Sequence, residues 1–321
     1  MARTALRRPE GSSEGSRLGS ARAAGRGTGN LRLRQVGSAT PVVGHPDDTS
    51  SEARPVNQLR QIRVLGHSIR VAVRQGTGDG PPLLLCNGIG ASLDLLEPFV
   101  EQLDPAITVV RFDVPGVGGS PDPRLPYRFA MVAHGVGKLM TELGHHQYDV
   151  LGISWGGGLA QQLALQHPRR VRRAVLVSTA TGSLMVPGSP RVLRKMITPQ
   201  RYRDPNYMRE VASELYGGQM RNRPDEVVHV MHEHSRVGSK RGYLLQLLAG
   251  AGWSSLPTLP LIKQPTLVLA GDDDPIIPLV NARIMHRLLP NAHLHVFSDG
   301  HLGLVTSAEK LAPVVAEFLR D

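Results

Sequence analysis

One stretch, residues 148–159, constrains the fold more than any other part of the chain. A short apolar strand pattern (150–153) runs directly into Ser154, and a helical pattern follows at once. Gly152 and Gly156 flank the serine, which gives the Gly-x-Ser-x-Gly pattern of a nucleophile elbow. Glycine allows close backbone approach at such a strained turn, and the following helix directs N–H groups at developing negative charge. A glycine-rich turn without chemistry fits the same residues, so the hypothesis needs partners elsewhere.

Strand and helix patterns alternate along most of the chain after about residue 58. We expect strands at 61–65, 68–74, 82–86, 107–112, 148–153, 171–178, 266–270 and 293–297, and helices at 93–103, 129–143, 156–167, 279–289 and 308–319. Such alternation predicts an α/β fold in which a mostly parallel central sheet carries helices on both faces. Ligands of these sheets bind at the carboxyl ends of the strands.

Residues 181–261 interrupt this alternation. The segment holds several short helical patches and seven prolines, namely Pro187, Pro190, Pro199, Pro205, Pro224, Pro257 and Pro260. An insertion of this length within a compact domain is normally functional, and we expect it to form a lid over the site.

The first 57 residues read as a disordered basic tail, separate from a folded domain at 58–321. They are rich in Gly, Ser, Ala and Arg and show no sustained apolar period, so they cannot bury enough apolar surface to offset their ordering entropy. Residues 1–60 hold ten arginines and five acidic residues. The excess of five positive charges is half of the formal net charge of +10. A solvated basic segment is favoured over specific nucleic-acid binding.

Composition also limits the environment of the protein. Cys86 is the single cysteine, so no disulfide forms within the chain, and no stretch resembles a secretory signal. No run approaches eighteen consecutive apolar residues, so no membrane span is expected. These features favour a cytoplasmic protein. Cys86 itself is expected to pack as a small buried hydrophobe, and Asp113, at a strand end, to be structural.

A serine nucleophile needs a base and a group that orients the base. In folds that carry this elbow, the acid and the histidine follow the serine in the chain. Three adjacent aspartates, residues 272–274, come directly after the strand pattern at 266–270, and their position alone does not choose among them. His301 lies just past the strand pattern at 293–297. We expect His301 to take the proton of Ser154 and one aspartate to fix the imidazole tautomer.

The negative charge that forms on a substrate oxygen needs two backbone donors. One is the N–H of the residue after the nucleophile, here Trp155. The second comes from the loop after an early strand, where residues 87–90 (Asn-Gly-Ile-Gly) fit and Ile89 is the expected donor. An oxyanion hole formed by Ile89 and Trp155 is therefore predicted.

Other candidate sites are weaker. His229, His232 and His234 lie close together in the insertion, but they lack a paired carboxylate–histidine motif, so solvated or packing roles are favoured over a metal site. Residues 116–119 (Gly-Val-Gly-Gly) start like a dinucleotide-binding fingerprint, but Pro121 stands where its third glycine would be required. Neither a metal site nor a dinucleotide site is expected.

Several longer sequence blocks occur together from about residue 61 to the C-terminus. They are NGIGAS (87–92), FDVPGVGGS (112–120), PYRF (126–129), GISWGG (152–157), VPG (186–188), GAGWS (250–254), AGDDDPIIP (270–278) and DGHL (299–302). As a set they resemble the intracellular depolymerases of medium-chain-length poly(3-hydroxyalkanoate), which have the α/β-hydrolase fold. The tail has no counterpart in this resemblance.

The resemblance implies a function and a set of residues. It assigns the nucleophile, acid and base to Ser154, Asp274 and His301, and so selects among the three aspartates. It implies hydrolysis of a storage polyester held in cytoplasmic granules to 3-hydroxy acids, through an acyl-enzyme on Ser154, with no metal or organic cofactor. The apolar insertion would then shield a greasy side chain from water.

Three alternatives stay open at this point. A general carboxylesterase, or a carbon–carbon bond hydrolase of aromatic degradation, would share the fold and the triad. A non-catalytic binding protein on this fold is a further alternative, against which the complete triad argues. The basic tail, finally, could bind nucleic acid or a granule surface through its charge.

Overall fold

The computed structural model describes residues 57–233 and 236–320, without the side chains of residues 226, 227 and 230. The expected tail, residues 1–57, lies outside the described part of the chain except for Asn57, which begins the first strand. The described residues belong to one compact unit.

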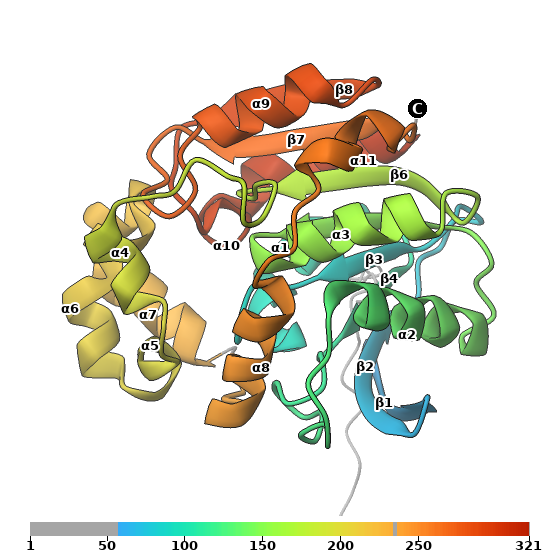
Figure 1. The fold of residues 1–321 in the computed structure, drawn as a ribbon, viewed down its shortest axis with the longest axis horizontal. Coiled ribbons are helices and arrows are strands. Elements are labelled where there is room, and N and C mark those ends of the chain that lie inside the picture. The colour runs from blue at the N-terminus through green and yellow to red at the C-terminus, as the bar shows by residue number, and fades with distance from the viewer. Residues whose placement is uncertain (1–56, 234–235, 321) are drawn as a thin grey trace, which may run out of the picture. The chain divides into compact units, whose positions relative to one another are not determined.

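A central sheet of eight strands organises this unit (Figure 1). The strands are β1 (Asn57–Val64), β2 (His67–Arg74), β3 (Leu83–Cys86), β4 (Val109–Phe112), β5 (Tyr148–Ile153), β6 (Val171–Val177), β7 (Thr266–Gly271) and β8 (Ala292–Phe297). They lie in the order β1-β2-β4-β3-β5-β6-β7-β8, in which β2 is antiparallel to both of its neighbours and all other pairs are parallel. The predicted mostly parallel sheet is confirmed. Its strand order reverses at β3, so the loops after β3 and β5 meet at the switch point where such sheets bind ligands.

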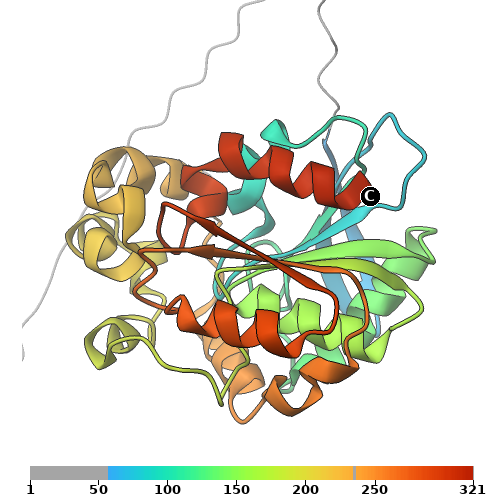
Figure 2. The same ribbon diagram turned by 90° about the horizontal axis from the view of Figure 1, so that it is seen from above.

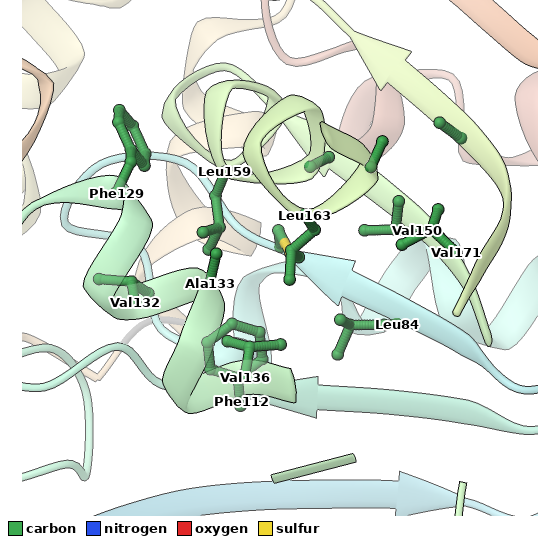
Figure 3. Packing of buried hydrophobic residues seen from close by; sticks show 14 of the residues in the cluster. Leu84, Phe112, Phe129, Val132, Ala133, Val136, Val150, Leu159, Leu163 and Val171 are labelled. Carbon is green, nitrogen blue, oxygen red and sulfur yellow. The ribbon is translucent and has the colours of Figure 1, made fainter. Parts of the chain in front are cut away.

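Helices cover both faces of the sheet, as Figure 2 shows from above. α2 (Phe129–Glu142), α3 (Trp155–Gln166) and α9 (Val280–Leu288) share one buried cluster, whereas α1 (Glu97–Gln102), α10 (Gly303–Thr306) and α11 (Ala308–Arg320) share another. Successive residues of β3 alternate between the two clusters: Leu84 packs under α2 and α3 (Figure 3), and Leu83 and Leu85 face the other way. The sheet is therefore buried on both faces, which explains the unbroken apolar runs in its parallel strands.

Two helix predictions differ from the structure. The helix expected at 93–103 is split into a 3₁₀ turn, η1 (Leu93–Leu96), and α1, because Pro98 has no N–H with which to continue the first segment. The four-residue helix α10 was not predicted, since a single turn carries no period. Gly137 lies within α2, where a Cβ would come within 2.9 Å of the His167 ring.

The insertion, residues 181–261, is helical. It contains α4 (Pro190–Lys195), α5 (Gln200–Arg203), α6 (Pro205–Tyr216), η2 (Gly218–Arg221), α7 (Pro224–Glu233), α8 (Lys240–Gly250) and η3 (Leu256–Leu261). Many of its prolines open helices, where their missing N–H needs no partner. A bridge between Gly182 and Ser254 joins the two ends of the insertion. In Figure 1, α4–α7 lie beyond the carboxyl ends of the parallel strands.

Candidate active site

Ser154 occupies the turn between β5 and α3 in a strained conformation, with φ 55° and ψ −118°. Its N–H donates to the Val177 carbonyl of β6 at 2.9 Å, which fixes the turn to the sheet. A Cβ on Gly156 would overlap the Cys86 carbonyl of β3, and one on Gly152 would overlap the carbonyl of Gly156. Both glycines of the motif are thus required by backbone approach, as expected of a nucleophile elbow.

His301 and Asp274 form a buried pair at the ends of β8 and β7. His301 Nδ1 donates to Asp274 Oδ2 over 2.8 Å, and the two side chains are 4% and 1% exposed. The other carboxylate oxygen of Asp274 accepts the N–H groups of Ile276 and Ile277, each at 2.9 Å. With Nδ1 occupied in this way, Nε2 of the neutral imidazole is free to accept a proton, which is the arrangement that a general base needs.

The three adjacent aspartates have three different partners. Asp274 pairs with the histidine. Asp273 accepts from Arg221 Nε of the insertion at 2.7 Å, and this hydrogen bond lowers the pKa of Asp273 below its ordinary value. Asp272 accepts from the Ser298 hydroxyl at 3.1 Å, next to β8. Their positions in the sequence did not distinguish the three aspartates, but their contacts do, because only Asp274 bonds to His301.

Ser154 and His301 line one cleft, together with residues of the loop after β3. The cleft has a cavity volume of about 20 Å³ in this structure and is partly open to solvent. Its wall is mostly apolar: Leu95, Leu96, Met196, Leu302 and Val305 line it. Apolar side chains with a few polar groups among them are the lining typical of a site for an apolar ligand.

Of the two predicted oxyanion donors, Ile89 lines this cleft, and Trp155 follows Ser154 as the first residue of α3. In the described part of the chain, neither the Ile89 N–H nor the Trp155 N–H has a protein acceptor. Asn87 shapes the first loop, because its side chain donates to the Ser92 carbonyl at 2.6 Å and accepts the next N–H, of Gly88, at 2.8 Å. Two free backbone donors beside a nucleophile are what an oxyanion requires.

Contacts from the insertion hold these same loops, and sequence reasoning missed them. Gln246 of α8 accepts the Gly90 N–H at 2.7 Å with its side chain and the Trp155 indole N–H at 2.9 Å with its carbonyl. The Tyr202 hydroxyl donates to the Ile89 carbonyl at 2.9 Å. These residues follow no catalytic motif, so no sequence signal could have identified them.

Tyr216, at the end of α6, was also missed. Its ring stacks near the His301 ring, with 6.2 Å between centroids, and its carbonyl accepts the His301 N–H at 2.8 Å. The insertion therefore contacts the histidine as well as the oxyanion loop.

Asp113 and Cys86 have the structural roles that were expected. Asp113 accepts the N–H groups of Leu93 (2.6 Å) and Gly119 (2.7 Å) and contacts Arg70 at 3.2 Å. Burial raises the pKa of Asp113, and burial likewise raises that of the Cys86 thiol, which packs in the main cluster.

The histidines of the insertion lie apart from the cleft lining. His229 pairs with Glu233 at 3.1 Å on an exposed face of α7, and His234 lies outside the described residues. Across residues 57–233 and 236–320, no group of three His, Cys, Asp or Glu side chains could hold a metal ion. None of the described helices is long and apolar enough to cross a membrane.

Comparison with known proteins places this geometry in a family. Residues 81–308 match the model of the alpha/beta hydrolase fold. The chain is 49% identical over 264 residues to a poly(3-hydroxyalkanoate) depolymerase of Ectopseudomonas oleovorans, covering 82% of this chain and 93% of that protein. It is 31% identical to a 2-hydroxymuconate semialdehyde hydrolase of Pseudomonas sp. CF600, over 76% of this chain and 89% of the relative. The crystal structure of an enol-lactonase from Burkholderia xenovorans LB400 superposes with a TM-score of 0.70 at 25% identity, covering 82% of this chain and all of that one.

Proposed function

Because the chain belongs to the α/β-hydrolase family and, within it, to the poly(3-hydroxyalkanoate) depolymerases, we propose that it is a serine hydrolase of medium-chain-length poly(3-hydroxyalkanoate). The observation that carries the proposal is the buried His301–Asp274 pair in a cleft that Ser154 also lines, at a strained elbow. The products are 3-hydroxy acids.

The reaction proceeds in two halves. His301 Nε2 accepts the proton of Ser154 as Oγ attacks the ester carbonyl, and Asp274 holds the imidazole in the required tautomer. The N–H groups of Ile89 and Trp155 stabilise the oxyanion, a contribution of about 3–4 kcal/mol per donor in serine hydrolases. His301 then protonates the leaving alcohol, and a water activated by the same imidazole cleaves the acyl-enzyme.

The apolar cleft supports the substrate part of the proposal. Leucine, methionine and valine side chains beside Ser154 suit an alkyl side chain of several carbons, at about 0.8 kcal/mol for each methylene group buried. The insertion supplies part of this wall through Met196 and thereby acts as a lid that excludes water from the acyl-enzyme.

We further propose that the protein is cytoplasmic and acts at the surface of polyester granules. The basic charge of residues 1–60 supports attraction to an anionic granule coat. Such binding weakens at high salt and upon deletion of residues 1–56, and unchanged granule co-sedimentation after the deletion would remove this part of the proposal.

The decisive experiment compares the full chain with its Ser154→Ala variant. Granules of poly(3-hydroxyoctanoate) are incubated with each protein, and released 3-hydroxy acids are quantified beside hydrolysis of p-nitrophenyl acetate and octanoate. We expect acid release by the wild type and a loss of about 10⁶-fold in kcat for the variant. Activity on the p-nitrophenyl esters alone would favour a general carboxylesterase. Folded wild-type protein that a fluorophosphonate leaves unlabelled would favour a non-catalytic binding protein.

A further inference from the structure

A buried arginine of the insertion borders the cleft without an acidic partner. Arg201, in α5, is 1% exposed and lines the cleft together with Ser154 and His301. Within the described part of the chain no carboxylate lies within ion-pair distance of Arg201, and no acidic side chain lines the cleft. A buried charge without a counter-charge is costly, so this arrangement calls for an explanation.

Two of the other buried arginines pair with carboxylates, and the third is surrounded by carbonyls. Arg70 pairs with Asp94 at 2.7 Å and with Asp113 at 3.2 Å, and Arg111 pairs with Glu97 at 2.5 Å. Arg74 has no carboxylate within ion-pair distance either, but its two Nη atoms donate to four backbone carbonyls, those of residues 100, 103, 104 and 107, and only its Nε lacks a hydrogen-bond partner in the described residues. Each of these three guanidinium groups thus has a carboxylate or four carbonyls to compensate its charge, whereas Arg201 has two carbonyls and one hydroxyl.

The contacts of Arg201 leave part of the guanidinium open. Nη1 donates to the Tyr243 hydroxyl at 2.8 Å and to the Thr198 carbonyl at 3.3 Å, while Nη2 reaches the Ile89 carbonyl only at 3.4 Å. Nε has no hydrogen-bond partner in the described residues, which is also true of Nε in Arg74 and Arg111, so the weakly bonded Nη2 is what distinguishes Arg201. The rings of Tyr202 and Tyr243 lie 4.6 and 5.3 Å from the guanidinium carbon and favour its charged form without neutralising it.

A second unpartnered donor lines the same cleft. The Tyr216 hydroxyl is buried near the Arg201 charge, and no hydrogen bond to it is formed within the described residues. Burial raises the pKa of Tyr216 more than the nearby Arg201 lowers it, so the phenol stays a neutral O–H donor. A fixed cation and a free hydroxyl beside an otherwise apolar cleft are complementary to one ligand class, an organic carboxylate on a hydrocarbon chain.

We propose that Arg201 and Tyr216 form a subsite for the terminal carboxylate of the polyester chain. This inference rests on the proposed function. In a poly(3-hydroxyalkanoate), the carboxylate end lies on the alcohol side of the last ester bond. Binding it here makes the terminal unit the leaving group, so the enzyme shortens the chain from its carboxyl end.

The reaction balances with this orientation. Ser154 Oγ bonds to the carbonyl carbon of the penultimate unit, the ester C–O bond breaks, and the alcohol oxygen of the terminal unit takes the proton that His301 received from Ser154. The terminal unit leaves as a 3-hydroxy acid anion. Water then cleaves the acyl-enzyme, and the shortened chain carries a new carboxylate, which the same subsite can bind for the next cycle.

The test uses trimers of 3-hydroxyoctanoate that end in a free carboxylate or in its N-methylamide. For the wild type we expect kcat/KM for removal of the terminal unit to be about 10- to 100-fold higher with the carboxylate, the range for a hydrogen-bonded charged group. Arg201→Met abolishes the preference and Tyr216→Phe reduces it. Arg203→Met is the matched control, because Arg203 belongs to the same helix but donates to the Gly238 carbonyl on an exposed face.

Equal rates on the two trimers with the wild type would overturn the inference and leave the proposed function intact. Equal losses on both trimers for Arg201→Met would do the same, since they would mean that Arg201 only positions the Ile89 loop. If that variant does not fold, the wild type alone still decides: 3-hydroxyoctanoate should inhibit p-nitrophenyl octanoate hydrolysis at least 10-fold better than its amide. This inhibition also tests the subsite if the polymer itself is not cleaved, and equal inhibition would refute it.

Discussion

The sheet with its catalytic loops and the helical insertion reach the same cleft by different means. The sheet side positions its groups through backbone: Ser154 is held by a strained turn between two glycines, and Ile89 and Trp155 offer main-chain N–H groups. The insertion adds side chains, such as those of Gln246 and Arg201, to two contacts made by its backbone carbonyls. The difference indicates a division of roles, in which the sheet supplies ester chemistry common to the fold and the insertion determines which ester reaches it.

The two regions are nevertheless joined. A third buried cluster contains Ile89, Ile276 and Leu302 from the catalytic loops beside Tyr216 and Tyr243 from the insertion. The segment after α6 also reaches two acidic side chains at the ends of β7 and β8. In this structure the insertion is packed into the catalytic loops, so its residues are expected to affect stability as well as specificity.

The largest expected difference between the two regions is in the effects of substituting two adjacent aspartates. Asp274 belongs to the catalytic loops, and Asp273 contacts the insertion. We expect Asp274→Asn to lower kcat/KM on p-nitrophenyl octanoate by about 10⁴-fold, because the amide favours the wrong imidazole tautomer. Asp273→Asn weakens the contact with Arg221 of the insertion and should lower kcat/KM by less than about 10-fold, since exposed ion pairs contribute about 1 kcal/mol or less. Comparable losses in both variants, at unchanged melting temperature, would break the proposed division of roles.

The same contrast explains what could be predicted from sequence. The sheet, the elbow and the loops bearing Asp274 and His301 follow from short-range patterns, because strand periodicity and turn glycines are local properties. The helices of the insertion were expected only as patches, since their order in space depends on tertiary packing. Gln246 is 156 residues from Gly90 along the chain, and no local pattern encodes that contact.

Arg201 illustrates the same limit. In the sequence it is one of two arginines on a short helix. Its significance arises only from burial beside tyrosines and from the lack of an acidic partner in the described residues, and both are properties of the folded chain. Local sequence therefore predicts the chemistry better than it predicts the ligand.

Gln246→Leu tests whether the insertion supports the catalytic loops. The substitution leaves the Gly90 N–H without its acceptor and loosens the loop that carries Ile89. We expect kcat to fall by up to about 100-fold, because small displacements of a positioned group are costly. Gln162→Leu is the control, since Gln162 accepts the Trp253 indole N–H at 2.8 Å away from the cleft lining. Equal kcat for the two variants would argue that the insertion contributes to substrate binding alone.

The smallest expected effect concerns Asp299, whose hydrogen bonds join the insertion to the segment after β8. We consider its contribution to the free energy of unfolding and how that contribution depends on pH. This buried carboxylate accepts from Gln219 of the insertion and from Thr306 and Ser307 of the sheet side, at 2.6–3.2 Å. Burial opposes its ionisation, but the hydrogen bonds, with Ser307 foremost, outweigh burial and lower the pKa of Asp299. A lowered folded-state pKa means that the carboxylate stabilises the fold above its unfolded value of about 3.9 and that this stabilisation is lost as the pH falls through the folded value.

Asp299→Asn should therefore reduce the free energy of unfolding by about 2 kcal/mol at pH 7, and the difference from wild type should shrink below about pH 4. Urea titrations of both proteins between pH 3 and pH 7 measure it. Asp272→Asn, at an exposed position beside the same strands, is the control and should follow the wild-type curve. If Asp299→Asn destabilises the protein by the same amount at pH 3 and at pH 7, the carboxylate charge does not contribute. The hydrogen bonds alone would then join the insertion to the sheet.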